Sequence, residues 1–301
     1  MTTHFHLLPF VLCLFAFVQG EGARQIVPEE FIKARPAKST ATTAKGPSYR
    51  PAAPQPAAAR KNSGAKASEM TQLGLTIWRL RPAKAADTGA RIIVQESDET
   101  AEWTPERVEA NTPLRVGERI RISIESPRTG YLYVIDREQY ADGTLSEPYL
   151  IFPTTRTRGG DNRVTAGRVI EIPGQGDRPN YFRLQQSRPN QIAEMMTVLV
   201  TMQPLEGLTI GPQPLVLAKE QVAKWEKDWS APAERFELVG GAGKTWTPAE
   251  QAAGADGTRL LTQEDPSPQT IYRVATKPGE PMLIKVPLRY SRPPTQTRKS
   301  K

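Results

Sequence analysis

The residue types best suited to catalysis and metal binding are almost absent from this chain. Both histidines, His4 and His6, and the only cysteine, Cys13, stand within the first 13 of its 301 residues. If that segment is removed, the mature protein has no imidazole and no thiol. Such a chain cannot perform Ser-His-Asp or Cys-His catalysis, form disulfides, or build a zinc site from His or Cys.

Carboxylates are the acid–base groups that remain, and they gather at two places. Four acids flank a predicted hairpin and four more precede Trp103: Asp136, Glu138, Asp142 and Glu147, and Glu96, Asp98, Glu99 and Glu102. Paired carboxylates hydrolyse glycosides or hold Ca²⁺, but neither group has the spacing of a calcium-binding loop, and acids at exposed turns are usually solvated. We therefore expect no catalytic residue, no metal site and no cofactor.

Two further motifs have simple structural explanations. The glycine-rich stretch 240–245 ends in Gly-Lys-Thr, but Leu238 stands where a phosphate-binding loop requires glycine, so we interpret it as a flexible connector. The five tryptophans suggest a sugar-stacking surface, whereas the helical spacing of Trp225 and Trp229 favours core packing. A secreted carbohydrate-binding protein or a carboxylate-dependent glycoside hydrolase therefore remains the alternative to a non-enzymatic module.

The segment that contains Cys13 indicates export. Residues 7–18 are a run of 12 apolar residues, too short for a membrane span of about 20 but suited to a secretory signal, and Val18-Gln19-Gly20 follows. The first six residues contain no Lys or Arg, unlike most signals. We predict a signal peptide over 1–20 and a periplasmic or extracellular protein with no transmembrane span; a buried N-terminal helix or an uncleaved anchor is the alternative.

The net charge of +8 lies in the two tails. Residues 21–72 carry nine basic and four acidic residues, and residues 291–301 carry four basic and no acidic ones, whereas residues 73–290 are nearly neutral. A nucleic-acid-binding fold carries a basic face, so we expect no nucleic acid to bind through the fold. The tails suit at most a weak contact with an anionic surface.

The stretch 21–72 is rich in Ala, Pro, Lys, Ser and Thr, and we predict a disordered linker there. Its apolar residues gather around Phe31 and Ile32, after a Pro-Glu-Glu helix start at residues 28–30. This cluster is a candidate docking peptide for a partner, or else an apolar remnant beside the cleavage site.

Alternation of apolar and polar residues dominates the rest of the chain and predicts β-strands. Residues 119–125 place three isoleucines on one face and polar groups on the other, typical of a half-buried strand. Further strands are expected at residues 75–80, 91–95, 131–136, 149–152, 169–172, 181–184, 195–202, 270–275 and 282–288, with turns at 142–143 and 277–280. The pattern favours a mainly β, antiparallel, sandwich-like or open-barrel domain with two short helices.

The two helices are expected at 218–229 and 247–254. The first has an apolar stripe that ends in Trp225 and Trp229; the second begins with a capping box from Thr247 to Glu250, and Gly254 stands where a C-terminal cap belongs.

The strand at 130–135 is apolar on both faces, so we expect it to be central and covered on each side. We predict a positive φ at Gly130, in the turn before it. Leu132 and Val134 share one face, and Tyr131, Tyr133 and Ile135 share the other. Core packing is the favoured role of Tyr131 and Tyr133; a groove for a partner is the alternative.

One known family has a similar order of motifs. These are the sequences at 116–122, 130–135, 142–143, 150–153 and 169–173, and a closing apolar strand around 196–200. Together they resemble the bacterial domain of unknown function 4384 over residues 115–202, although Thr154 stands where that family commonly has Asn. The resemblance implies an exported or surface-exposed β-rich module without assigned catalytic residues.

These observations predict a linker over 21–72, a β-rich domain over 73–290, and a basic tail over 291–301. Within the domain we expect a family-like core at 113–203 and an extension at 204–290. The function we expect is that of an exported, non-enzymatic interaction module for an envelope or extracellular protein partner.

Overall fold

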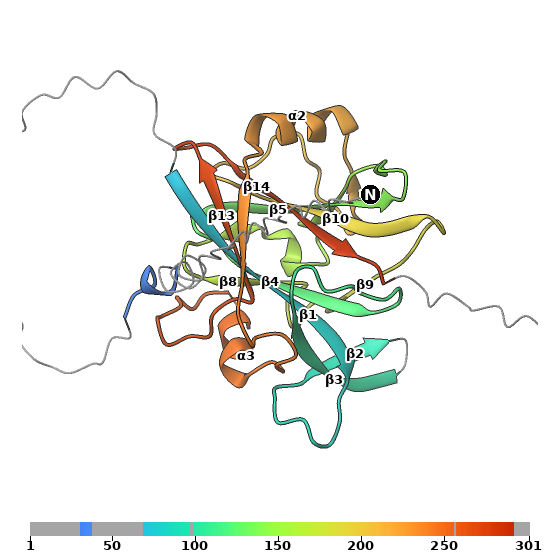
Figure 1. Cartoon of the computed structure of the whole chain (residues 1–301), viewed down its shortest axis with the longest axis vertical. Helices are drawn as coiled ribbons and strands as arrows, with labels where there is room; N and C mark the ends of the chain where they lie inside the picture. Colours follow the sequence, from blue (N-terminus) through green and yellow to red (C-terminus); the bar gives the residue numbers. More distant parts are fainter. Residues whose placement is uncertain (1–30, 38–68, 97–98, 256, 292–301) are drawn as a thin grey trace, which may run out of the picture.

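Two antiparallel β-sheets packed face to face form the body of the protein, as the computed structural model shows (Figure 1). The structure describes residues 31–37, 69–96, 99–255 and 257–291. The expectation of a mainly β, sandwich-like domain is confirmed, and the strands of the described residues do not close into a barrel. The predicted signal peptide and most of the predicted linker lie outside the described residues.

The larger sheet has eight strands. Its main path runs β12 (Ala233–Glu237), β13 (Thr270–Thr276), β1 (Glu69–Pro82), β3 (Glu99–Val108), β2 (Ile92–Glu96). Strand β1 also pairs with β4 (Arg119–Glu125), along the edge opposite to β13 and β3. Strand β4 in turn pairs with β8 (Val169–Ile172) and β9 (Phe182–Arg183). Strand β1 begins at Glu69, so the body starts four residues before the boundary we predicted at 73.

The smaller sheet has six strands. Its main path runs β11 (Leu215–Val216), β6 (Tyr149–Phe152), β5 (Gly130–Tyr140), β10 (Gln191–Thr201), β14 (Met282–Arg289), and β7 (Arg163–Val164) pairs with β5. The turn predicted at 277–280 is present, with Glu280 N–H donating to Lys277 O. It connects β13 in one sheet to β14 in the other, so the chain changes sheets there.

Aliphatic side chains fill the space between the sheets. The larger sheet contributes Leu73, Leu75, Ile77, Ile120, Ile122 and Ile124, and the smaller sheet contributes Leu132, Val134, Val198, Val200, Ile284 and Val286. The three isoleucines of β4 therefore face the core, as their alternation predicts.

The opposite face of β4 is also covered, which the sequence pattern did not predict. Arg121 is only 1% exposed; its Nη2 donates to Glu171 Oε2 at 2.7 Å, and its Nη1 donates to Asn180 O at 2.6 Å. The predicted half-buried strand is therefore buried on both faces, because an ion pair lets its polar face be covered.

Both predicted helices are present. Helix α2 (Lys219–Trp229) lies over the outer face of the smaller sheet, where Val222 and Trp225 join a second apolar cluster with Tyr133, Ile135 and Leu199 (Figure 1). Helix α3 (Pro248–Gly254) begins with the predicted capping box between Thr247 and Glu250. A short 3₁₀ turn, η1 (Arg158–Gly160), lies between β6 and β7.

Gly130 and Gly254 have a different structural role from the one that the sequence predicts. Gly254 is the last residue of α3 rather than a left-handed cap, and a Cβ there would lie 2.1 Å from Glu171 Oε1. Gly130 begins β5 without a positive φ, and its Cβ would lie 2.0 Å from Thr201 O. Both positions need glycine because another group approaches the backbone closely.

The predicted central position of the 130–135 strand is confirmed. Strand β5 lies between β6 and β10. Leu132 and Val134 face the inter-sheet core, while Tyr133 and Ile135 face the cluster under α2.

Candidate peptide-binding cleft

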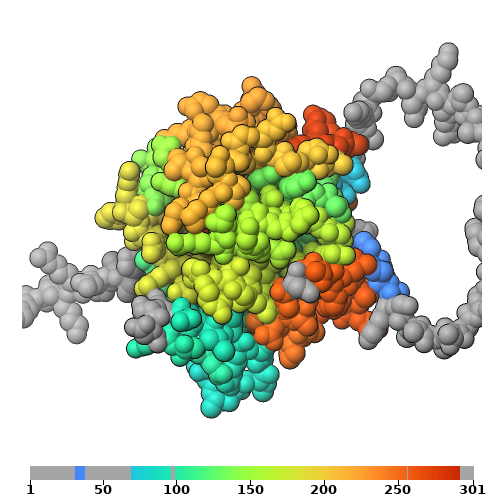
Figure 2. Space-filling model, turned by 180° about the vertical axis from the view of Figure 1, so that it is seen from behind, coloured from blue at the N-terminus to red at the C-terminus, as the bar shows by residue number. Residues whose placement is uncertain are grey.

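Residues 31–37 pack against the body of the protein, although 31 residues separate them from β1. They form one helical turn, closed by the hydrogen bond from Arg35 N–H to Ile32 O at 3.0 Å. Figure 2 shows this blue segment against the orange surface of the later part of the chain. Phe31 and Arg35 point inward and are 8% and 4% exposed.

The deepest contact is the ion pair between Arg35 and Glu125, the last residue of β4. Arg35 Nε donates to Glu125 Oε1 at 2.9 Å, and Arg35 Nη2 donates to Glu125 Oε2 at 2.6 Å. The guanidinium therefore binds the carboxylate through two parallel hydrogen bonds. Such bidentate pairs are the strong, geometrically specific form of charge-assisted hydrogen bond. Burial raises the pKa of Glu125, and the Arg35 guanidinium opposes this shift.

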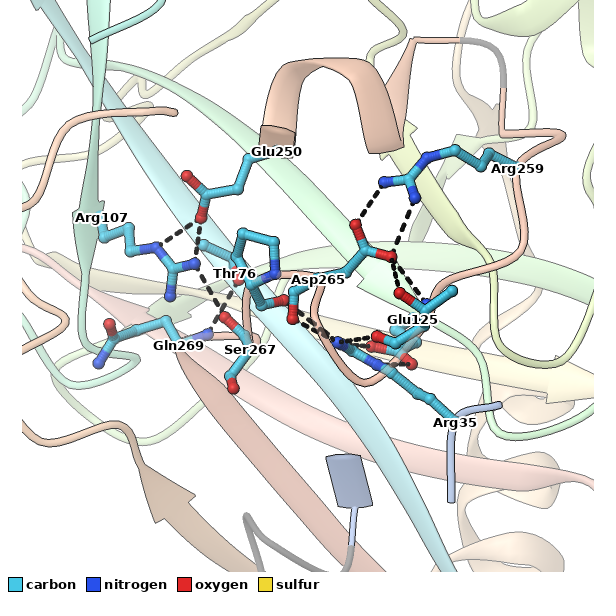
Figure 3. A network of polar contacts seen from close by, with 11 residues as sticks. Arg35, Thr76, Arg107, Glu125, Glu250, Arg259, Asp265, Ser267 and Gln269 are labelled. Carbon is cyan, nitrogen blue, oxygen red and sulfur yellow. Dashed lines mark hydrogen bonds and ion pairs between the residues drawn. The ribbon is translucent and has the colours of Figure 1, made fainter. Parts of the chain in front are cut away.

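The loop of residues 262–268, here called the clamp loop, surrounds the rest of the guanidinium (Figure 3). Arg35 Nη1 donates to Asp265 O at 2.9 Å and, at longer distances, to Thr262 O and Pro266 O. Main-chain carbonyls on one side and a carboxylate on the other thus satisfy the donors of Arg35. A planar guanidinium with five N–H donors fits this set of acceptors better than the ammonium group of lysine, which has three donors.

The clamp loop also recognises the main chain of the segment through one residue. Gln263 N–H donates to Pro36 O at 3.1 Å, and its side-chain Nε2 donates to Arg35 O at 3.0 Å and Lys33 O at 3.3 Å. These bonds do not depend on the identity of the residues whose carbonyls accept them. They are therefore suited to holding a peptide backbone in place while Phe31 and Arg35 give specificity.

Two polar contacts fix the shape of the clamp loop, an ion pair at Asp265 and a hydrogen bond at Ser267 (Figure 3). Asp265 accepts two bonds from Arg259 and one from Thr262 N–H. Burial alone would raise the pKa of Asp265, but these donors hold it below its ordinary value. At the other end Arg107 Nη2 donates to Ser267 O at 2.8 Å.

Arg107 is itself held by Glu250, the capping-box residue of α3. Glu250 Oε1 accepts from Arg107, while Oε2 accepts from Thr247 N–H and Thr247 Oγ1. The cap of α3 and the clamp loop are therefore parts of one polar network that supports the cleft.

Phe31 occupies an apolar recess next to Ile271 of β13. Gly74 of β1 keeps this recess open, because a Cβ at that position would lie 3.0 Å from Phe31 Cζ and 2.9 Å from Pro268 Cγ. Arg35 also lies over the Phe31 ring, 5.8 Å from its centroid, which adds a cation–π contact.

An open groove of about 560 Å³ continues beside the segment. Met70, Arg128, Met202 and Leu260 line it, together with Phe31 and Arg35. A longer bound peptide would have room there, next to the aromatic and arginine positions.

Of the four predicted partner-binding residues, the structure brings Phe31 and Ile32 to this cleft and places the tyrosines elsewhere. Ile32 is partly buried beside Phe31 and Ile271. Tyr133 is 3% exposed and its hydroxyl accepts from Leu205 N–H at 2.8 Å, so it is a core residue. Tyr131 is half-buried at the edge of the cluster under α2.

The predicted carboxylate groups do not assemble into one site. Glu102 is exposed and pairs with Arg91, Asp142 caps its own turn through Thr144, and Glu147 is exposed and pairs with Lys219. Glu99 is exposed, Asp98 lies outside the described residues, and the side chain of Glu96 is not described. Of these eight acids, Asp136 and Glu138 are half-buried and lie on β5 beside Glu194 of β10.

The tryptophans form no common sugar-stacking surface. Trp78, Trp225 and Trp246 are buried, and Trp229 stacks on Trp225 with centroids 5.8 Å apart. Trp103 is half-buried under Arg119. The core-packing interpretation of Trp225 and Trp229 is therefore confirmed. The stretch 240–245 forms a glycine turn in which Gly240 and Gly243 have positive φ, as a connector requires.

Sequence reasoning missed Arg35, Glu125 and Gln263. Arg35 is one of the nine basic residues of the predicted linker, and its charge alone does not mark it as buried. The available signal was its position four residues after Phe31, which puts both on one face of a helical turn.

Comparisons with known proteins add one match. Neither a curated protein nor a solved structure matches the chain significantly. No helix among the described residues is long and apolar enough to cross a membrane. Residues 113–198, which run from just before β4 to within β10, match the model of the family described as a domain of unknown function (DUF4384).

Proposed function

We propose that this protein is an exported, non-enzymatic interaction module that binds a peptide segment of a partner in the cleft now occupied by residues 31–37. The segment the cleft recognises carries an aromatic residue four positions before an arginine. The observation that carries this proposal is the bidentate, buried pair between Arg35 and Glu125, with the clamp loop on the peptide backbone.

The cleft has the features of a peptide-binding site. Glu125 selects a guanidinium, and the recess at Gly74 selects an aromatic ring. Gln263 donates to main-chain carbonyls of the segment, which every residue type provides. The segment that fills it is joined to the body through the 31 residues 38–68. A segment joined covalently to its site competes with other ligands at an effective concentration on the order of 1 mM, so a partner segment of higher affinity can displace it.

The apolar run at 7–18 supports export, and the partner is accordingly an envelope or extracellular protein. Intact-mass measurement of the protein from its native source tests this part. We expect a chain that begins near Glu21; a mass that includes Cys13 would contradict signal removal.

The binding test uses the full chain and a fluorescent peptide of residues 28–37. The double variant Phe31→Ala/Arg35→Ala empties the cleft, and we expect it to bind the peptide saturably. The wild type should bind at least about tenfold more weakly, because its own segment competes. A peptide in which alanine replaces Arg35 serves as the matched control.

Two outcomes would overturn the proposal. One is the lack of saturable binding by a double variant that still melts cooperatively. The other is equal affinity for the control peptide, which would show that Glu125 does not select arginine. The non-enzymatic part fails if a hydrolase panel finds turnover that an Asp or Glu substitution abolishes.

A further inference from the structure

A second buried polar feature lies where Asp136 of β5 and Glu194 of β10 face the space between the sheets. Asp136 is opposite Met196, and Glu194 is opposite Glu138. Asp136 and Glu194 are therefore diagonal neighbours on one face of an antiparallel pair, a spacing at which side chains still interact.

Each of the two carboxylates has an oxygen that is buried and has no partner. In the part of the chain that the structure describes, no donor reaches Asp136 Oδ1 or Glu194 Oε2. Glu194 as a whole is only 8% exposed. A buried acceptor without a donor costs free energy, so this geometry favours a group that brings hydrogen-bond donors.

The other groups around the pair are already engaged. Glu194 Oε1 accepts from Tyr290 Oη at 2.5 Å and from Gln191 Nε2 at 2.8 Å. Glu138 Oε2 accepts from Tyr140 Oη and Ser187 Oγ, both at 2.5 Å. These bonds leave the orientation of Glu194 fixed, with Oε2 still free to accept.

Both carboxylates line a cavity of about 130 Å³. Its other walls are largely apolar: Ile120, Ile122, Ile151, Phe182, Leu184, Met196 and Leu288. Arg183 lines it as well. The volume is about four times that of a water molecule in the liquid, so it suits a small organic group with one charged end.

We propose that this cavity is a binding site for a primary alkylammonium group, either a small amine or the end of a lysine side chain. An ammonium is a compact cation with three donors, and the unpartnered Asp136 and Glu194 oxygens accept from it while its alkyl chain contacts the apolar walls. The described residues contain no cluster of three or more His, Cys, Asp or Glu side chains suited to a metal ion. This argues for an organic cation over Ca²⁺, which takes six to eight oxygen ligands.

Binding should depend on pH in a defined direction. Burial raises the pKa of Glu194 to about 7, and Glu138 nearby adds to the shift. Burial also raises the pKa of Asp136, with Glu194 as a further cause. The groups facing the pair are Glu138, Tyr290 and Arg183. Because an ammonium binds the ionised carboxylates, its binding displaces protons, and affinity should increase from pH 6 to pH 8.

Isothermal titration of the full chain with n-butylammonium chloride tests the site, and n-butanol is the matched uncharged probe. We expect saturable binding of the amine at pH 8 and about tenfold or greater loss with Glu194→Gln, as expected for loss of a hydrogen bond to a charged group. Asp136→Asn should have the same effect. Glu220→Gln, an exposed substitution on α2, should change nothing.

Four results would overturn the inference. The first three are no amine binding at pH 8, binding of n-butanol equal to that of the amine, and an amine affinity in Glu194→Gln and Asp136→Asn equal to that of the wild type. Tighter binding of Ca²⁺ than of the amine would also contradict it, since the site would then be a metal site. None of these results bears on the peptide cleft, which is at the opposite end of β4 from Ile120.

Discussion

The carboxylate of Glu171 occupies the space in which residue 254 would place a side chain. A Cβ on Gly254 would lie 2.1 Å from Glu171 Oε1, and Glu171 is the buried partner of Arg121. Helix α3 can therefore approach β8 only because it ends in glycine. The approach couples the capping box at one end of α3 to a buried ion pair at the other.

Substitution Gly254→Ala should lower the free energy of unfolding by roughly 1–3 kcal/mol, the usual cost of overpacking a buried site. The methyl group must displace Glu171, and this disturbs its bond to Arg121. Urea unfolding monitored by tryptophan fluorescence measures the loss. Gly176→Ala is the control, because no atom lies within 4 Å of a Cβ there. Equal stability of the two variants would contradict this account of Gly254.

Substitution Tyr133→Ala should cost about 3–5 kcal/mol, since it removes a buried aromatic ring. Tyr133→Phe should cost about 1 kcal/mol, because it removes only the acceptor of Leu205 N–H. Tyr149, of which 40% is exposed, provides the comparison, and its replacement by alanine should cost far less. A Tyr133→Ala melting curve that overlaps the wild type would instead favour a ligand groove.

Features of the fold that depend on neighbouring residues in the sequence were predictable, and features that depend on distant residues were not. Strand β4, the capping box at Thr247 and the central position of β5 follow from patterns within a few residues, and all three were predicted. The sequence predicts glycine at 130 and 254 for its backbone conformation, whereas the structure requires it because there is no space for a Cβ atom. The groups that approach them, Thr201 and Glu171, come from distant parts of the sequence.

The candidate cleft was harder to predict for the same reason. Arg35 and Glu125 are 90 positions apart, and Arg121 and Glu171 are 50 apart. An arginine in a sequence has the same appearance whether it is solvated or buried, because its burial depends on the carboxylate that meets it. Phe31 and Ile32 were recognisable because apolar residues stand out in a polar linker. Strand β3 was missed because its acids and Pro105 obscure the alternation.

The contribution of Glu194 to the stability of the protein should decrease as the pH rises between about 4.5 and 7. Burial raises the pKa of Glu194 from 4.5 to about 7, so the folded state holds a proton that the unfolded state has released in this range. Stability then falls with increasing pH by up to about 3 kcal/mol for such a shift.

Glu194→Gln should remove that contribution, so its unfolding free energy should change less between pH 5 and pH 8 than that of the wild type. Urea unfolding at unit pH intervals measures both slopes. Glu220→Gln should keep the wild-type slope. A Glu194→Gln slope equal to that of the wild type would mean that Glu194 has an ordinary pKa in the folded protein.

Substitution Gly74→Ala should release residues 31–37 without altering Arg35 or Glu125. The added Cβ would lie 3.0 Å from Phe31 Cζ and 2.9 Å from Pro268 Cγ, so the ring and the clamp loop cannot both keep their places. Overpacking costs about 1–3 kcal/mol. If this cost destabilises the docked state of the segment, its amide hydrogens should exchange roughly 5–150-fold faster. Exchange mass spectrometry should show this increase in residues 31–37 and little change in β5 and β10. Unchanged protection of the segment, or an equal loss of protection throughout both sheets, would show that Gly74 does not control the docking of Phe31.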